Sequence, residues 1–343
     1  MIRLVFSNRS LFALLCWLLV PVASGADRVR LFVEGNERSH HALIARSIAT
    51  FIAKPAGIDV EVRYTAGPPA TLARLREGSG QQFALLPADV ADAYLAAAAR
   101  GNVDADQLIA PVRVIAPLHD EDIYFMVRSN SPLNYIHEIE RARINLGAPG
   151  SGSALTVTTL YRHLFNATLP EAQASFHSTQ EALVKLTEES VDVVALVSPY
   201  PSRLLADMKP EARRFVKLLK FDPKQSGAAK VSGIYSSNIV PAAGYPNLLD
   251  SDLTTLSVKT YLASHGKSNL LQSRLASAWC QNLPRMIEQG PLALKDLVVS
   301  LPPLVSGWQY ARPFQRELMA CMEGKRAPPE SCSFEDRLLG LCS

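Results

Sequence analysis

Residues 146–156 read LGAPGSGSALT, so a strand end, a glycine-rich turn and a helix start follow one another here. The first turn of a helix has unpaired N–H groups and carries the positive end of the helix dipole. Glycines let a ligand approach the backbone closely, and the hydroxyls of Ser151, Ser153 and Thr156 add hydrogen-bond donors. The stretch therefore predicts a binding site for a carboxylate or a small phosphate. A serine-capped helix after a tight turn is the alternative interpretation.

Two nucleotide-binding motifs fail at this turn. The dinucleotide-binding pattern G-x-G-x-x-G does not fit glycines at 147, 150 and 152. The P-loop pattern matches at Gly147 and Gly152, but Ser153 stands where that motif requires lysine. Because lysine contacts the terminal phosphates in a P-loop, a nucleoside triphosphate site is excluded.

Before this stretch, the apolar pattern predicts alternating strands and helices. Apolar and charged residues alternate over 58–64, which is typical of a half-buried strand. Asp89 is a plausible N-cap of the alanine-rich helix that follows. We expect strands over 112–118 and 123–127, separated by a solvated loop, His119-Asp120-Glu121-Asp122. This order predicts an α/β domain with a largely parallel sheet.

A second series of strands and helices runs from about residue 128, and the chain then returns toward the first domain. We expect lobe 1 over residues 27–122 and 235–343, and lobe 2 over residues 123–234. The lobes would be joined by strand crossovers without a flexible linker, which suits hinge closure around a central cleft.

The N-terminus predicts export. Arg3 and Arg9 precede an apolar run over 11–20, and small residues follow the break at Pro21. This is the layout of a signal peptide, which we place at residues 1–26. A membrane anchor is the alternative, but ten apolar residues are about half the length of a transmembrane helix. A periplasmic location is therefore expected. The net charge of +3, without a Lys/Arg block, gives no reason to expect nucleic-acid binding.

Four cysteines fall in the last 64 residues, and Cys16 lies in the predicted signal peptide. An even number in an oxidising compartment predicts two disulfides, with three possible pairings. No C-x-x-C pair is present, so a zinc site at these residues is not expected. The four are Cys280, Cys321, Cys332 and Cys342.

The turn GAPGSGSA over 147–154 resembles the G-x-P-G-S-G-T signature of the TAXI-type solute receptors of TRAP transporters. Further similarities occur in the same order along residues 29–260, including Thr65-Ala66-Gly67 after a strand and Val191-Asp192-Val193-Val194-Ala195 before a proline. The chain differs at Gly35-Asn36-Glu37-Arg38-Ser39-His40-His41, where the family has glycines and paired tyrosines. It also has Pro68-Pro69 where the family has glycine-serine.

The resemblance implies a two-lobed α/β periplasmic-binding-protein fold of the type II kind, with hinge strands and a ligand in the cleft. It implies a small anionic ligand of the dicarboxylate or amino-acid type, and membrane subunits of a TRAP permease as partners. A monomer suits this architecture. In such a fold the cleft is lined by turns at the carboxyl ends of strands. The ligand-binding residues expected here are Arg38, Ser39, His40, Thr65, Asp89, Gly150, Ser151, Gly152, Ser153, Thr156 and Tyr200.

Several of these residues have a simpler interpretation. Arg38 could be a surface charge, and Tyr200 could serve packing between two prolines. Neither a metal nor another cofactor is expected. One of two adjacent histidines at a helix start, as at His40-His41, is usually exposed, and the consecutive residues 119–122 cannot all face one ion. His119 sits at a strand crossover, from which it could face the cleft.

The sequence leaves two binding functions open, transport and ligand sensing through a signalling partner. An enzyme is not expected, because neither a G-x-S-x-G elbow nor an H-E-x-x-H motif appears.

Overall fold

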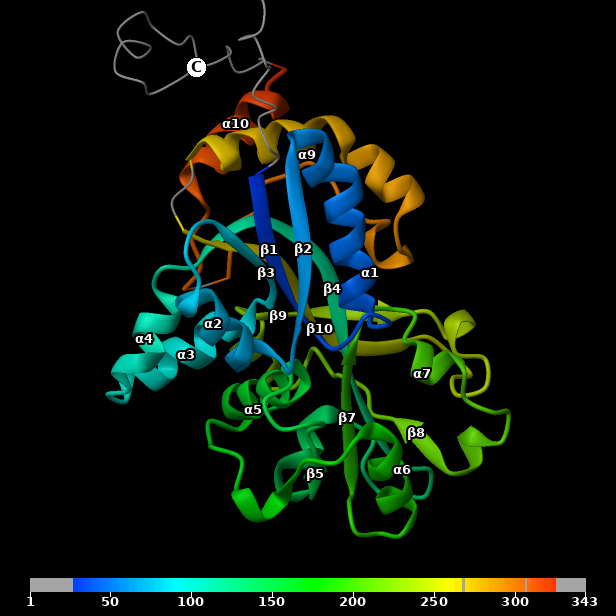
Figure 1. Ribbon diagram of the computed structural model, residues 1–343. Coiled ribbons are helices and arrows are strands. Elements are labelled where there is room, and N and C mark those ends of the chain that lie inside the picture. The colour runs from blue at the N-terminus through cyan, green and yellow to red at the C-terminus, as the bar shows by residue number, and fades with distance from the viewer. Residues whose placement is uncertain (1–26, 267–268, 306, 325–343) are drawn as a thin grey trace, which may run out of the picture.

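The computed structural model describes residues 27–266, 269–305 and 307–324 (Figure 1). The predicted signal peptide, Cys332 and Cys342 lie outside these residues. Within them, one mixed sheet has the strand order β2-β1-β3-β10-β4-β7-β5-β6, with β8 on β4 and β9 on β10. The strands are β1 Asp27–Glu34, β2 Ile58–Thr65, β3 Gln82–Pro87, β4 Arg113–Arg128, β5 Ile144–Asn145, β6 Ala174–Ser175, β7 Val193–Ser198, β8 Val216–Leu218, β9 Tyr235–Val240 and β10 Leu253–His265.

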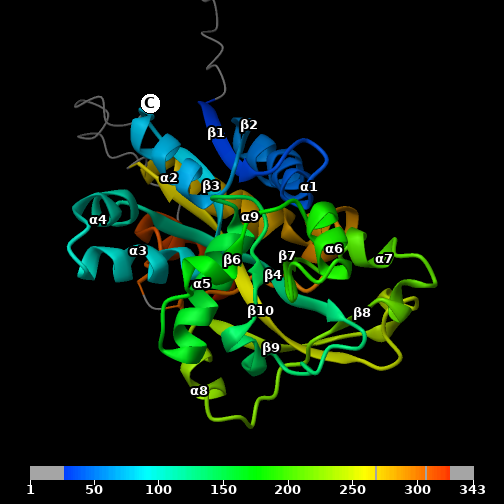
Figure 2. The same ribbon diagram turned by 90° about the horizontal axis from the view of Figure 1, so that it is seen from below.

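Two long antiparallel strands, β4 and β10, connect two groups of shorter strands. The first strand group is β2, β1 and β3, and β3 pairs with residues 260–265 of β10. The second strand group comprises β5, β6, β7, β8 and β9. In this group, β7 pairs with residues 122–126 of β4, and β9 pairs with residues 253–258 of β10. In Figure 2, which views the molecule from below, β4 and β10 pass through its centre. The two-lobed α/β architecture is confirmed, whereas the largely parallel sheet was wrong, because β4 and β10 run antiparallel to their neighbours.

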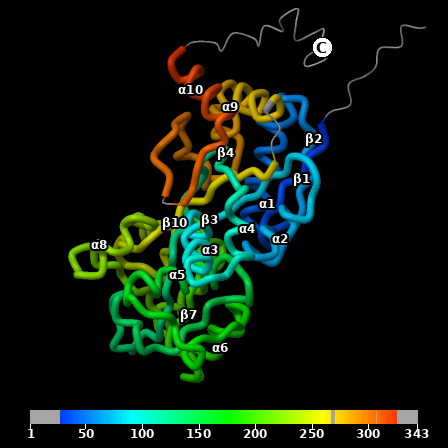
Figure 3. Tube along the Cα trace, turned by 90° about the vertical axis from the view of Figure 1, so that its left-hand side faces the viewer, coloured from blue at the N-terminus to red at the C-terminus, as the bar shows by residue number. Residues whose placement is uncertain are grey.

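Helices cover both halves of the sheet, and α9 and α10 lie at the end opposite α6 and β7 (Figure 3). Ser39 caps α1, Ser151 caps α5 and Ser178 caps α6, each by accepting a hydrogen bond from a backbone N–H of the first turn. The helices are α1 His40–Ser47, continued by a π-helical turn over Ile48–Ala53, α2 Pro68–Glu77, α3 Asp89–Ala99, α4 Val103–Ile109, α5 Gly152–Phe165, α6 Thr179–Thr187, α7 Arg203–Ala206, α8 Ala228–Val231, α9 Asn269–Gln289 and α10 Arg312–Met322. Short 3-10 turns lie at Lys54–Ala56, Ile136–Arg141, Glu171–Gln173, Ala212–Arg214, Ala242–Gly244 and Leu292–Leu294.

Buried apolar side chains form separate clusters on the two faces of the sheet. One packs α1 and α9 against the first strand group and includes Leu31, Ile48 and Trp279. The largest lies on the other face and runs through both halves of the molecule, with Phe125 of β4 and Leu160 of α5 among its members. Because this cluster is continuous, the two halves share part of their core.

Strand β4 differs from the sequence expectation. Residues 112–118 and 123–127 were expected to be two strands, but β4 is continuous, so residues 119–122 are strand and not a solvated loop. His119, Glu121 and Asp122 are buried, whereas Asp120 is exposed. In a strand, alternate side chains share a face, so His119 and Glu121 point the same way. The loop prediction failed because three of these four polar residues face the protein interior, which a hydropathy pattern does not show.

A disulfide between Cys280 and Cys321 joins α9 to α10 across 41 residues of chain. Closing a loop of this length lowers the entropy of the unfolded chain, which stabilises the fold by about 3 to 4 kcal/mol. We expect the double variant Cys280→Ser/Cys321→Ser to lose stability of this order in urea unfolding, relative to the oxidised protein. Equal unfolding midpoints for the two proteins would show that this bridge contributes nothing.

Among the described helices, none combines the length and the hydropathy needed to cross a bilayer.

Candidate functional site

The predicted anion site at the start of α5 already holds a carboxylate, which comes from the chain itself. The backbone N–H of Gly152 donates to both carboxylate oxygens of Glu34, at 3.1 and 2.9 Å. Ser151 caps the helix by accepting a hydrogen bond from the Ala154 N–H at 3.2 Å. Glu34 ends β1 in the first strand group, so this contact joins the two halves of the molecule. The helix terminus therefore binds an anion, as the sequence suggested, but Glu34 was not foreseen as that anion.

Burial raises the pKa of Glu34 to about 7, although its His41 neighbour and the Gly152 N–H favour the charged form. A small cavity of about 150 Å³ surrounds this carboxylate. Its walls come from both halves of the molecule, namely Glu34, Gly35, Ser39, His40, His41, Pro87, Glu121, Gly152, Ser153 and Val197.

Three histidines and one glutamate meet beside this cavity. His40 and His41 begin α1, and His119 and Glu121 come from the same face of β4. The Glu121 Oε1 atom lies 2.6 Å from His40 Nε2, 3.1 Å from His41 Nε2 and 3.9 Å from His119 Nε2. One potential ligand atom from each of the four residues falls within 4.8 Å of the others. We call these four residues the His–Glu cluster.

The electrostatics of the His–Glu cluster centre on Glu121. Burial alone raises its pKa, but the charge of His41 and the approach of the three histidine rings to its carboxylate hold that pKa well below the usual value. Burial lowers the pKa of His41, but the charge and hydrogen bonding of Glu121 together with the charge of Glu34 outweigh burial, so that pKa is raised. For His40, burial and the neighbouring His41 together lower the pKa. The opposite shifts of His41 and Glu121 are those of a buried ion pair.

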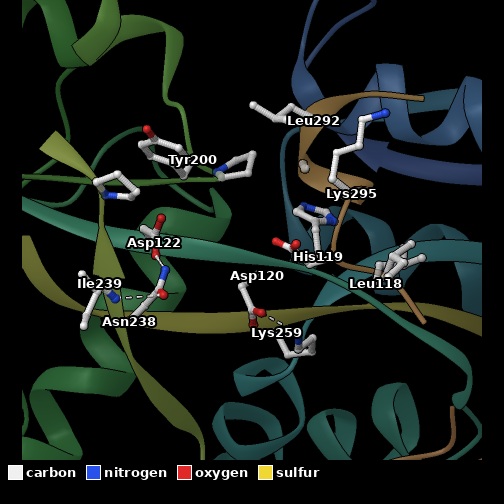
Figure 4. Close-up of a pocket in the computed structure, with 15 residues that line it drawn as sticks. Leu118, His119, Asp120, Asp122, Tyr200, Asn238, Ile239, Lys259, Leu292 and Lys295 are labelled. Atoms are coloured by element: carbon white, nitrogen blue, oxygen red, sulfur yellow. Dashed lines mark hydrogen bonds and ion pairs between the residues drawn. The ribbon is translucent and has the colours of Figure 1, made fainter. Parts of the chain in front are cut away.

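A second, larger cavity of about 430 Å³ adjoins the His–Glu cluster at His119. Asp122, Tyr200 and Asn238 lie on one side of it, and His119, Leu292 and Lys295 lie on the other (Figure 4). Asn238 donates to Asp122 at 2.6 Å, and Lys259 forms an ion pair with Asp120 at 2.6 Å. The volume of this second cavity is in the range of small-molecule sites, about 300–1,000 Å³.

The structure brings some of the predicted ligand-binding residues together and separates others. Ser39, His40, Gly152 and Ser153 line the small cavity, and Tyr200 lines the larger one. Gly150 and Ser151 shape the turn before α5, with Gly150 at a φ of +72°. Thr65 contacts Thr71 at 2.8 Å beside the turn at Gly67, while Arg38 is exposed.

Asp89 and Thr156 lie inside the protein and line neither cavity. The N-cap of α3 is Ala88, so the N-cap interpretation of Asp89 was wrong. The Asp89 carboxylate instead accepts a hydrogen bond from the Tyr235 hydroxyl at 3.0 Å, and that hydroxyl also lies 3.2 Å from the Thr156 carbonyl oxygen. These contacts hold α3, α5 and β9 together and give both residues a packing role.

Sequence reasoning missed Glu34, His41 and Glu121 as site residues, and it considered His119 only as a residue that could face the cleft. The usable signal was the spacing of His119 and Glu121 by two, which places both on one face if residues 119–122 are strand. Glu34 gave no such signal, because its partner Gly152 lies 118 positions away.

The chain belongs to the NMT1-like family, whose model matches residues 41–270. No curated protein matches this sequence. Solved structures with a similar arrangement include XAC2383 from Xanthomonas citri bound to ATP (13% identity, 86% of this chain and 97% of that one, TM-score 0.45). A second is the periplasmic binding protein BugD, with 14% identity over 87% of this chain and 95% of that one and a TM-score of 0.46. A third is the arginine-, lysine-, histidine-binding protein ArtJ from Geobacillus stearothermophilus, with 11% identity over 77% of this chain and 97% of that one and a TM-score of 0.44.

Proposed function

We propose that this chain is an exported solute receptor that binds a small carboxylate at the start of α5 and delivers it to a TRAP-type permease. One observation carries the proposal. The Gly152 N–H binds a carboxylate, that of Glu34, inside a cavity walled by both halves of the molecule. A solute carboxylate would replace Glu34 there, with Ser39 and Ser153 beside it. Cleavage of residues 1–26, the TAXI-type subfamily and the lobe boundaries near residues 122 and 235 belong to this proposal.

Binding without turnover is the activity proposed. The α5 terminus supplies a fixed N–H group and a helix dipole, which hold an anion. Closure of two lobes around the solute would present one surface to a permease, as hinge-bending receptors do. No observation on the described residues favours the sensing alternative over transport.

The proposal is tested with a thermal-shift screen of small carboxylates and amino acids. Bound solute is first removed by partial unfolding and refolding. A ligand at 100 times its Kd stabilises by about 2.7 kcal/mol, which raises the unfolding midpoint by several degrees. We expect Glu34→Gln to bind the hit several-fold more tightly, because it removes the competing carboxylate from Gly152.

Glu37→Gln is the matched control, because Glu37 is an exposed acid in the same turn. It should leave affinity unchanged. Gly152→Val should abolish binding, because a Cβ at residue 152 would lie 2.6 Å from the Glu34 Oε2 atom, in the space that a carboxylate needs. If no carboxylate raises the midpoint of either the natural protein or Glu34→Gln, the proposal is wrong.

A further inference from the structure

The His–Glu cluster has a composition that a purely structural ion pair does not require. One histidine would satisfy the charge of Glu121, yet three converge on it. His119 is the least explained of them. Its side chain is 1% exposed, and neither ring nitrogen has a hydrogen-bond partner. A buried imidazole without a partner loses the hydrogen bonds that it made to water, which destabilises the folded protein. The Glu121 Oε1 atom, at 3.9 Å from His119 Nε2, is beyond hydrogen-bond distance.

We propose that His40, His41, His119 and Glu121 bind one divalent transition-metal ion of the zinc class. The expectation of no metal, drawn from the sequence, is reversed here because β4 places His119 and Glu121 on one face and α1 adds two further imidazoles. Three imidazoles and one carboxylate form a four-coordinate donor set of the kind that Zn²⁺ accepts. Imidazole-rich sites favour zinc, copper, iron or nickel over the oxygen-seeking ions magnesium and calcium.

The distances suit such an ion. Tetrahedral zinc with ligands at about 2.0–2.1 Å sets its ligand atoms about 3.3 Å apart. The four atoms of the cluster already lie within 4.8 Å of one another, so each would need to move only slightly to reach that spacing.

The second shell is also present. The Thr260 hydroxyl donates to Glu121 Oε2 at 3.2 Å. Contacts of this kind orient the ligands of metal sites.

The site has a route to solution and an open side. His40 is the exposed member, with 34% of its side chain accessible. His40, His41 and Glu121 line the small cavity, and His119 lines the larger one, so the ion would sit in the wall between them. Glu34 is held by Gly152 and is not needed as a ligand. Cation binding therefore does not depend on the carboxylate proposal, and each can fail while the other holds.

The test uses the full chain, expressed for export and purified without a polyhistidine tag. The protein is dialysed against EDTA, then against chelator-free buffer, and titrated with ZnCl₂ in equilibrium dialysis. We expect one zinc per chain. With CoCl₂ we expect the intense visible absorption of tetrahedral cobalt, which Zn²⁺ then removes. Absence of stoichiometric zinc, or only the weak absorption of octahedral cobalt, would overturn the proposal.

Two variants and one control assign the binding to these residues. His119→Ala and His40→Ala should each lower zinc affinity by roughly 100-fold or more, since even loss of an outer-shell partner costs about 10–100-fold. His40→Ala keeps the test valid if His119→Ala fails to fold, because His40 is partly exposed. His137→Ala, which removes an imidazole stacked on Tyr135, should bind zinc like the natural protein. If zinc affinity is unchanged in His40→Ala, the ion binds elsewhere and the assignment is wrong.

Discussion

Replacing Gly67 by alanine is expected to destabilise the protein by about 4 kcal/mol, because this residue lies where two turns from the two halves of the molecule meet. Its backbone has φ +147° and ψ −171°, a conformation that is almost confined to glycine and costs other residues about 1–3 kcal/mol. An added Cβ would overlap the Gly150 carbonyl oxygen and come within 2.9 Å of the Ser151 Cα. Both neighbours are backbone atoms, so overpacking adds about 1–3 kcal/mol more.

The measurement is urea unfolding of Gly67→Ala beside Gly101→Ala. Gly101 also has a positive φ, +92°, but nothing lies within 4 Å of its Cβ position. It therefore reports backbone strain alone, for which we expect about 1–2 kcal/mol. If the two variants lose equal stability, the contact between the turns at Gly67 and Gly150 contributes nothing. The same contact lies beside the Gly152 anion site, so Gly67→Ala should also weaken carboxylate binding.

The glycine-rich turn before α5 was predictable because its signals are local. Capping residues, glycine positions and the helix that follows are all encoded within residues 146–156. The alternating strand over 58–64 was recognisable for the same reason, and β2 spans Ile58–Thr65. Short-range periodicity and capping describe such elements because their cause lies in neighbouring residues.

The His–Glu cluster could not be predicted in this way because its members come from α1 and β4, about 80 residues apart in sequence. Local polarity at residues 119–122 favoured a loop, whereas β10 pairs with residues 120–122 and β7 pairs with β4 from Asp122 onward, which keeps the segment extended. Once β4 is one strand, its polar residues must find interior partners. Glu121 contacts the histidines, and Asp122 accepts hydrogen bonds from Asn238 and Tyr124. Tertiary pairing thus decided both the secondary structure and the candidate site.

The second large effect concerns pH and Asp89. Burial raises the pKa of Asp89 to about 7, from an ordinary value of 3.8. The folded protein therefore binds a proton between pH 4 and 7 that the unfolded chain does not bind. Stability linked to Asp89 is fully present below pH 4 and falls by about 1.4 kcal/mol per pH unit as the pH rises to 7. Above pH 7 both states are ionised and no further change follows from this group. The total loss is about 4 kcal/mol.

Asp89→Asn removes this titration while keeping an oxygen that accepts from Tyr235. We expect the variant to gain stability relative to the natural protein as the pH rises from 5 to 8, by about 2.5 to 3 kcal/mol, measured by urea unfolding at each pH. Glu34 and Asp122, whose pKa values burial raises to about 7 and about 6, titrate in both proteins and cancel in this difference. Asp106 is exposed and gives the control variant Asp106→Asn. Its stability relative to the natural protein should not change between pH 5 and 8. If the relative stability of Asp89→Asn is also independent of pH, the folded protein accommodates the Asp89 carboxylate in its ionised form. The elements α3, α5 and β9 would then be held together around a buried charge.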